Sequence, residues 1–222
     1  MGTLYLVRHG QASFGADDYD QLSELGHRQC VRLGEYFRAQ GRRFDAVLTG
    51  TLKRQVQSLA GIAEGMQWTP QPLSWPGLNE YDSEALIAAA DPHATARPVT
   101  PEQMRQHFRL LREGLTRWMA GSAAPVGMPS YTEFVAGVNA ALDHVRREHE
   151  GDVLIVSSGG PIATAVGQVL GTSAETTIDL NMRIRNSAVT EFAFSAKRHV
   201  LVTFNTLAHL DHPDHASWVT HA

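Results

Sequence analysis

Short apolar runs alternate with longer amphipathic stretches along this chain. The runs at 3–9, 44–50 and 152–157 contain many branched and aromatic residues, and such runs are typical of buried strands. A shorter and weaker run lies at 71–75. Near the C-terminus, two segments alternate apolar and polar residues and are joined by a short connection around 196–198. These two segments predict a β-hairpin.

Between these runs, apolar residues recur at helical spacing. The stretches with this spacing are 22–41, 51–66, 130–151 and the segment PIATAVGQVLG at 161–171. Ser130 and Glu133 form a capping-box pattern at the start of the third stretch, and Gly151 is expected to end it.

The character of the chain changes from Glu84 to about Pro129, where helical patterns and turns follow one another without a strand signal. We interpret this segment as a helical insertion over about 84–129. Elsewhere strands and helices alternate and a hairpin follows, which favours an α/β sandwich. Its sheet should be mostly parallel, with helices on both faces and an antiparallel edge.

Charge and composition narrow the classes of function. The formal net charge is −4 and no run of Lys or Arg forms a basic stripe, so nucleic acid and anionic membranes are disfavoured as partners. The single cysteine, Cys30, excludes a disulfide framework and a thiolate metal cage. No apolar stretch is long enough to span a bilayer, and the N-terminus shows no signal-peptide pattern. These features lead us to expect a cytoplasmic protein.

The run at 152–157 stops abruptly at a group of small residues, Ser157, Ser158, Gly159 and Gly160. A strand that ends in hydroxyls and glycines before a helix makes a cradle for an anion. In parallel α/β sheets, ligands bind beyond the carboxyl ends of the strands. The residues that follow the other two strong strands, Arg8-His9-Gly10 and Thr49-Gly50, should therefore lie at the same rim.

Four side chains near this rim could act on a phosphate. Arg8 can bind phosphate oxygens with its guanidinium, which leaves the adjacent His9 free to attack phosphorus. Arg54, in the first turn of the helix after the second strand, could supply a second guanidinium, and Glu80 could lend a proton to a departing alcohol. Taken singly, each of these residues is explained equally well or better as a solvated surface residue.

The order of the motifs favours the catalytic interpretation. LVRHGQAS, LSELGHRQ, TGTLKRQVQS, LNEYD, VSSGG, NSAVTEF and FNTLAHL follow one another along the chain. Together they resemble the histidine phosphatase superfamily, the phosphoglycerate-mutase-like proteins, over about residues 3–210. The resemblance implies a single domain over residues 1–222, a three-layer α/β/α fold and a phosphohistidine intermediate.

On the matching positions, the resemblance assigns the chemistry residue by residue. His9 becomes the nucleophile, Arg8 and Arg54 the phosphate clamps, and Glu80 the acid and base. The further substrate-binding residues that we expect are Gln11, Ser13, Ser158 and Gly159. No metal or organic cofactor is implied.

The chain departs from the family pattern at Ser158, where a histidine normally precedes the glycine and touches the transferring phosphoryl group. A serine hydroxyl donates one hydrogen bond without charge, and loss of a charge-assisted bond would cost roughly 1.5–3 kcal/mol. That free energy corresponds to on the order of 10- to 100-fold in rate. Gln11 stands where the pattern often has Glu, and Gly15 where it often has Asn, which should alter contacts beyond the phosphate.

The tail from 208 to 221 contains four histidines and two aspartates, residue types that bind metals well. Pro213 interrupts the helical spacing there, and His209 matches the closing Asn-x-x-x-His-Leu of the family pattern. We therefore favour for His209 a role in packing or in support of the site, and we expect no functional metal in this terminal segment.

We expect a phosphatase that hydrolyses a small phosphorylated metabolite, a phosphomonoester, through phosphohistidine. One alternative is a phosphoglycerate-type mutase, which needs a strong grip on a carboxylate. The only basic residues that the insertion offers for this are Arg97, Arg105, Arg109, Arg112 and Arg117. A second alternative, motivated by Ser158, is a catalytically weak phosphate-binding regulatory protein. The sequence leaves open whether the chain forms a homodimer.

Overall fold

The computed structural model describes residues 1–13, 20–94 and 100–221. Gly15 and Arg97 lie outside the described residues, so what we expect of them stays a prediction.

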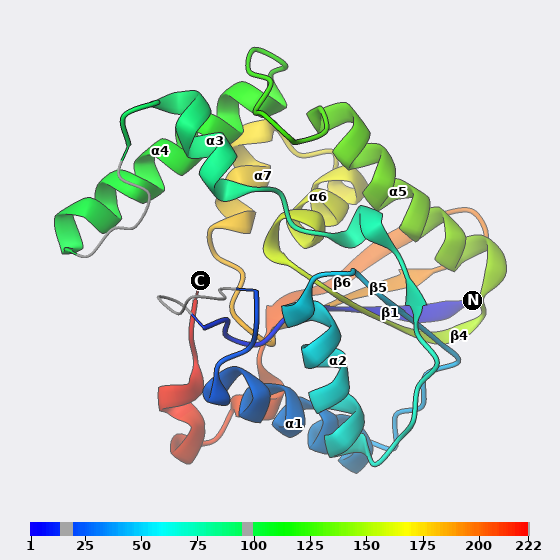
Figure 1. Ribbon diagram of the computed structural model, residues 1–222. Coiled ribbons are helices and arrows are strands. Elements are labelled where there is room, and N and C mark those ends of the chain that lie inside the picture. The colour runs from blue at the N-terminus through cyan, green and yellow to red at the C-terminus, as the bar shows by residue number, and fades with distance from the viewer. Residues whose placement is uncertain (14–19, 95–99, 222) are drawn as a thin grey trace.

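In the described part of the chain, a six-stranded sheet in the order β3-β2-β4-β1-β5-β6 forms the centre of the fold (Figure 1). The strands are β1 (Gly2–Arg8), β2 (Ala46–Thr49), β3 (Leu73–Ser74), β4 (Gly151–Ser157), β5 (Val189–Phe194) and β6 (His199–Thr206). The first four strands are parallel to one another, whereas β5 is antiparallel to both of its neighbours, β1 and β6. The predicted mixed sheet and its terminal hairpin are both confirmed.

Helices cover both faces of the sheet, which gives the expected three layers (Figure 1). One face is covered by α1 (Glu24–Ala39) and α2 (Lys53–Met66), and the other by α5 (Tyr131–Glu148) and α6 (Gly159–Leu170). The remaining helical elements are α3 (Ser83–Ala90), α4 (Pro101–Met119), α7 (Ala174–Asn181) and the 3-10 turns η1 (Pro76–Leu78), η2 (Ala208–Leu210) and η3 (Pro213–Trp218). Among the described helices, none combines the length and the apolar character that a bilayer crossing requires.

The alternation of side chains along each strand builds two separate cores. Tyr5 and Val7 of β1 point to one face and join the buried cluster under α1 and α2. Leu4 and Leu6 point to the other face and join the larger cluster under α5 and α6. Because both faces of β1, β2 and β4 are largely buried, these parallel strands have nearly continuous apolar sequences.

The structure differs from the sequence prediction at three places. The weak run at 71–75 forms only the two-residue strand β3. Gly151 does not end the preceding helix, because α5 stops at Glu148 and Gly151 is the first residue of β4. Its φ of +78° and its closeness to Asp45 explain why a glycine stands at this turn into the strand. Helix α7 was not predicted at all, since its sequence is mostly polar and carries little periodicity.

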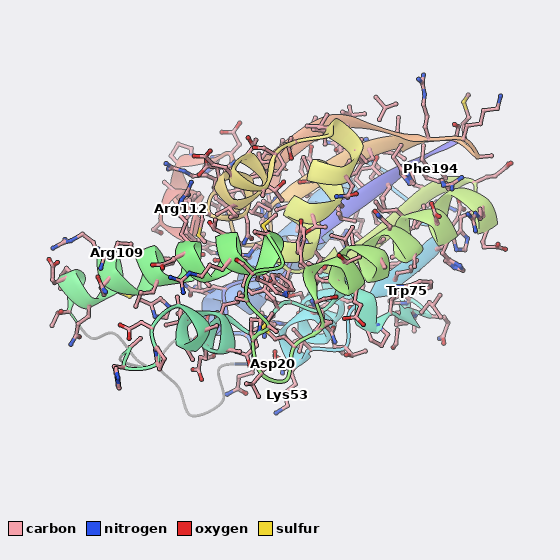
Figure 2. The ribbon with its side chains drawn as sticks, turned by 90° about the horizontal axis from the view of Figure 1, so that it is seen from above. Asp20, Lys53, Trp75, Arg109, Arg112 and Phe194 are labelled. Carbon is pink, nitrogen blue, oxygen red and sulfur yellow. The ribbon has the colours of Figure 1, made fainter. Side chains whose placement is uncertain are left out.

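The described residues of the predicted insertion are helical and contain no strand. Helix α3 packs against α4, where Gly114 allows close contact with the backbone of Leu86. The C-terminal end of α4 is anchored by Trp118, which is almost completely buried and donates a hydrogen bond to the carbonyl of Pro129 at 3.0 Å. In Figures 1 and 2, α4 extends outward beyond the edge of the sheet.

His209, which belongs to the 3-10 turn η2, is a second buried histidine. Its side chain is almost inaccessible, and Nε2 lies 2.9 Å from the Ser187 hydroxyl. Burial lowers the pKa of His209 to about 3, helped by the positive charge of Arg32 and by His215. The folded protein therefore keeps this ring neutral at a pH where an unfolded chain would protonate it.

This linkage predicts a loss of stability in mild acid. A histidine with a lowered pKa stabilises the fold above its usual pKa of 6.5, and that contribution is lost as the pH falls. Between pH 6.5 and 5, the cost for His209 is about 2 kcal/mol. Urea denaturation at both pH values should therefore show a smaller loss of unfolding free energy in His209→Asn than in the wild type. The exposed His212→Asn should behave like the wild type; equal losses in all three proteins would contradict the assignment.

Candidate active site

His9 is presented at the end of β1 as a neutral imidazole. Its backbone N–H donates to the carbonyl of Ser157 at 2.9 Å, which places it beside the end of β4. The ring is buried, with Nδ1 2.7 Å from the carbonyl oxygen of Gly10, so Nδ1 carries the hydrogen. Burial and the charges of Arg8 and Arg54 lower the pKa of His9 well below its usual value. Nε2 therefore holds a free lone pair near neutral pH.

Two buried guanidinium groups belong to the same site. Arg8 is the last residue of β1, and its Nη1 donates to the carbonyl of Ile184. Arg54, in the first turn of α2, donates from Nη1 to Asp20 Oδ1 at 2.6 Å. The second oxygen of Asp20 accepts the backbone N–H of Lys53 at 2.9 Å, and Asp20 and Lys53 lie close together in Figure 2. Asp20 thus fixes Arg54 at the start of its helix.

Glu80 reaches the same rim from the loop after η1. Both of its carboxyl oxygens lie 3.1 Å from the N–H of Gly160, in the first turn of α6. Burial raises the pKa of Glu80, against the lowering effects of the Gly160 hydrogen bond and of Arg54 and Arg8. A Cβ at Gly160 would lie 2.2 Å from Glu80 Oε1, so only a glycine admits the carboxyl here. A carboxyl with a raised pKa can both give and take a proton.

Ser158 is fully buried between the end of β4 and the start of α6. It is the N-cap residue of α6, yet its hydroxyl makes no capping bond. Instead, Ser158 Oγ accepts a hydrogen bond from Gln55 Nε2 at 2.9 Å. Gly159 directly follows it, so the backbone N–H of the first α6 residue lies at the same rim.

The two remaining predicted residues lie in the loop after β1 and have other contacts. The side-chain oxygen of Gln11 accepts from the Ser23 hydroxyl at 2.9 Å, next to the start of α1. Ser13 donates from its backbone N–H to Gln21 at 2.8 Å. The structure therefore places His9 and Glu80 near the same two arginines. Gln11 and Ser13 instead form hydrogen bonds with residues just before the start of α1.

Several residues that support His9 were not predicted from the sequence. The hydroxyl of Ser58 accepts the N–H of Gly10 at 3.0 Å and donates to the carbonyl of Arg54 at 2.6 Å. On the opposite side, the carbonyl of His9 accepts the Ser187 N–H at 3.1 Å. Ser58 lies four residues after Arg54, so helical spacing could have indicated it. Ser187 and Gln55 gave no comparable local signal.

A small hollow of about 20 Å³, room for about one water molecule, adjoins Glu80 through Tyr81 and Gly160. The ends of α4 and α5 and the helices α6 and α7 supply its other walls. Its described lining contains the aromatic residues Tyr81, Trp118, Tyr131 and Phe134 and the neutral polar residues Thr164, Thr177 and Asn181. None of the described residues that line it carries a charge.

The histidine-rich tail does not assemble into a metal cluster. Across residues 1–13, 20–94 and 100–221, no three His, Cys, Asp or Glu side chains come together as ligands. Within the tail, His215 packs against Trp218, and the Trp218 carbonyl accepts a hydrogen bond from the buried side chain of Gln29 at 2.6 Å. These contacts attach the tail to α1.

Solved structures with the same fold come from several enzymes. A phosphoserine phosphatase from Entamoeba histolytica, in complex with 3-phosphoglyceric acid, shares 20% identity at a TM-score of 0.67, covering 95% of this chain and 100% of that one. An alpha-ribazole phosphatase from Shigella flexneri shares 20% identity at a TM-score of 0.65, covering 93% and 97%. A phosphoglycerate mutase from Bacillus anthracis shares 17% identity at a TM-score of 0.66, covering 94% of each chain. At these identities the likeness concerns the fold alone.

The family itself follows from a match over nearly the whole sequence. The model of the histidine phosphatase superfamily, branch 1, matches residues 4–207, which span every strand of the described sheet except the first residues of β1. All the motifs that carried the resemblance lie in this one match, except that the last of them, FNTLAHL at 204–210, runs three residues past its end. The chain belongs to the histidine phosphatase superfamily.

Proposed function

We propose that this protein hydrolyses a small phosphomonoester through a phosphohistidine formed on His9. The observation that carries the proposal is the buried imidazole of His9, held through Nδ1 by the carbonyl of Gly10, with the guanidinium groups of Arg8 and Arg54 nearby. Burial, and after it these two charges, lower the pKa of the ring and keep it neutral. Such a ring is nucleophilic, and its surroundings favour a dianionic phosphate group. Glu80 adds a carboxyl with a raised pKa to the same site.

In the first step, the lone pair of His9 Nε2 attacks phosphorus in line with the departing alcohol. The new P–N bond forms as the bond between phosphorus and the ester oxygen breaks, and the protonated Glu80 carboxyl gives its proton to that oxygen. Arg8 and Arg54 bind the non-bridging oxygens and stabilise their charge. Positioning and charge stabilisation account for most of the catalysis in such transfers.

In the second step, water attacks the phosphohistidine. The Glu80 carboxylate takes a proton from the water as the new P–O bond forms and the P–N bond breaks. The electron pair returns to Nε2, inorganic phosphate leaves, and Glu80 is again protonated. The cycle is balanced without a metal or an organic cofactor.

The hollow beside Glu80 supports an uncharged leaving alcohol. The alcohol must lie on the side of Glu80, since that carboxyl protonates its oxygen. The hollow is too small to hold the alcohol as it stands, but the described residues around it, which the alcohol would meet, are apolar or neutral. A carboxylate there would lose its hydration without gaining a cationic partner, which is unfavourable. This argues for a neutral, partly apolar alcohol and against the mutase alternative, which requires a grip on the carboxylate of a phosphoglycerate.

Replacement of the nucleophile is the first test. His9→Ala should lower kcat for a phosphomonoester on the order of 10⁴-fold or more, because the covalent path is lost. Rapid quenching of the wild type with ³²P-labelled substrate should trap acid-labile phosphate that His9→Ala lacks. His27→Ala, a change on the exposed surface of α1, is the matched control and should keep full activity. Wild-type turnover that survives in His9→Ala would contradict the proposal.

Glu80 should control the pH profile. Its protonated form is needed for the first step, so kcat/KM should fall as the pH rises through its raised pKa, and His9 should stay deprotonated well below pH 6.5. Glu80→Gln should lower the rate for an alkyl phosphate by about 10²- to 10⁴-fold and remove that fall. p-Nitrophenyl phosphate, whose leaving group needs no proton, should lose much less. The exposed Glu84→Gln should retain the wild-type profile, whereas an unchanged profile in Glu80→Gln would exclude Glu80 as the acid.

The neutral hollow predicts a substrate preference. Phenyl phosphate should be hydrolysed with a higher kcat/KM than phosphoserine or 3-phosphoglycerate, by on the order of 10-fold or more. Met119→Lys places a cation in the lining of the hollow and should shift the ratio toward the two carboxylates. Met104→Lys, elsewhere on α4, should not shift it. Preference for the carboxylate substrates in the wild type would refute the neutral leaving group while leaving the hydrolytic mechanism intact.

A further inference from the structure

Gln55 is a fully buried amide beside the candidate active site that the mechanism above does not use. It belongs to the first turn of α2, one residue after Arg54. Its Oε1 accepts the backbone N–H of Leu52 at 3.2 Å. Its Nε2 donates to the carbonyl of Leu78 and to Ser158 Oγ, both at 2.9 Å. An amide nitrogen has two hydrogens, so both are used and the orientation of the amide is fixed.

The hydrogen bond from Gln55 determines what the Ser158 hydroxyl can do. Because Ser158 Oγ accepts from Gln55, its own hydrogen must point to a different acceptor. The first turn of α6 does not use the Ser158 oxygen as a cap, since the N–H of Gly160 binds Glu80 and Pro161 has no N–H. Among the described hydrogen bonds, none uses the Ser158 hydroxyl hydrogen or the N–H of Gly159, so these two neighbouring donors remain for a ligand.

Gln55 also explains why a histidine does not fit at position 158. Ser158 is buried, and the Gln55 nitrogen lies only 2.9 Å from its side-chain oxygen. An imidazole extends beyond the position of a serine oxygen, so on this backbone it would need the volume that the Gln55 amide fills. Gln55 and a histidine at position 158 are alternatives in a close-packed interior.

We propose that Gln55 is a positioning residue that orients the Ser158 hydroxyl as an uncharged donor to the transferring phosphoryl group. Gln55 and Ser158 act as a coupled pair and replace the histidine that the family pattern has at position 158. The proposal rests on the proposed function for the identity of the ligand, a phosphoryl oxyanion. Gln55 does not touch the phosphoryl group, because its hydrogen bonds are committed to protein atoms.

A double-mutant cycle tests the coupling. Ser158→Ala should weaken the binding of orthovanadate and of inorganic phosphate, and lower kcat/KM, on the order of 10-fold. Gln55→Met, which keeps the length of the side chain but cannot donate, should lose several-fold. Because Gln55 acts through Ser158, the combination Gln55→Met/Ser158→Ala should be no worse than Ser158→Ala alone. Calorimetric titration with each anion and steady-state kinetics measure these effects.

Ser157→Ala is the matched control for a purely structural role. The Ser157 hydroxyl donates to the same Leu78 carbonyl as Gln55, at 2.7 Å, without contacting Ser158 in any described hydrogen bond. If Gln55 only holds Leu78 and the loop that leads to Glu80, then Ser157→Ala should reproduce the loss of Gln55→Met, and the losses of Gln55→Met and Ser158→Ala should multiply. Either result overturns the proposal.

Exchange of the pair gives a second, independent readout. Ser158→His alone should lower Tm and fail to improve phosphate binding, because the ring competes with Gln55 for space. Gln55→Ala/Ser158→His should recover Tm and bind phosphate with a new pH dependence, stronger below the pKa of the introduced imidazole. A wild-type Tm and improved binding in Ser158→His, with Gln55 intact, would refute the competition for space.

The two proposals can fail separately. A wild type without turnover or phosphohistidine, but with anion binding that depends on the Gln55–Ser158 pair, would reject the hydrolytic function and support the pair. A wild type with full turnover and phosphohistidine, whose rate and anion affinity are unaffected by Ser158→Ala and Gln55→Met, would support the function and reject the pair.

Discussion

A neutral imidazole held against two guanidinium groups is the interaction on which the rest of the candidate site depends. Burial of the His9 ring already disfavours its charged form, and the charges of Arg8 and Arg54 disfavour it further. The hydrogen bond from Nδ1 to the carbonyl of Gly10 then leaves the lone pair on Nε2. A site with this balance of charge gains most from a ligand that brings negative charge, and a phosphate group does so.

Glycines near His9 and Glu80 allow neighbouring segments of the chain to come into close contact. A Cβ at Gly10 would lie 2.3 Å from the carbonyl oxygen of Gly26, so the loop after β1 can rest on α1 only with a glycine there. Gly160 has the same function for the Glu80 carboxyl at the start of α6. The strand ends thus deliver the reacting groups, and the glycines allow the neighbouring chain segments to come within hydrogen-bonding distance.

Several of the groups that would contact a ligand at this site carry no charge. The helix N-terminus and the Ser158 hydroxyl lie where the family pattern has an imidazole, and the hollow beside Glu80 is neutral in its described lining. A neutral donor in a buried position needs no counter-charge, but its direction must be fixed by a neighbour. In this chain the neighbour is Gln55, which joins the start of α2 to the start of α6.

The sequence by itself determined the mixed sheet, the helices of the insertion and the placement of Arg8, His9, Arg54 and Ser158 at strand and helix ends, because hydrophobic periodicity and capping residues are local signals. The tertiary structure alone decided the contacts between these ends. Gln55 and Ser158 are 103 positions apart, Gly160 and Glu80 are 80 apart, and Arg54 and Asp20 are 34 apart. No local pattern encodes such pairs, since packing of the layers sets their distances. Packing also sets the burial that keeps His9 neutral and raises the pKa of Glu80.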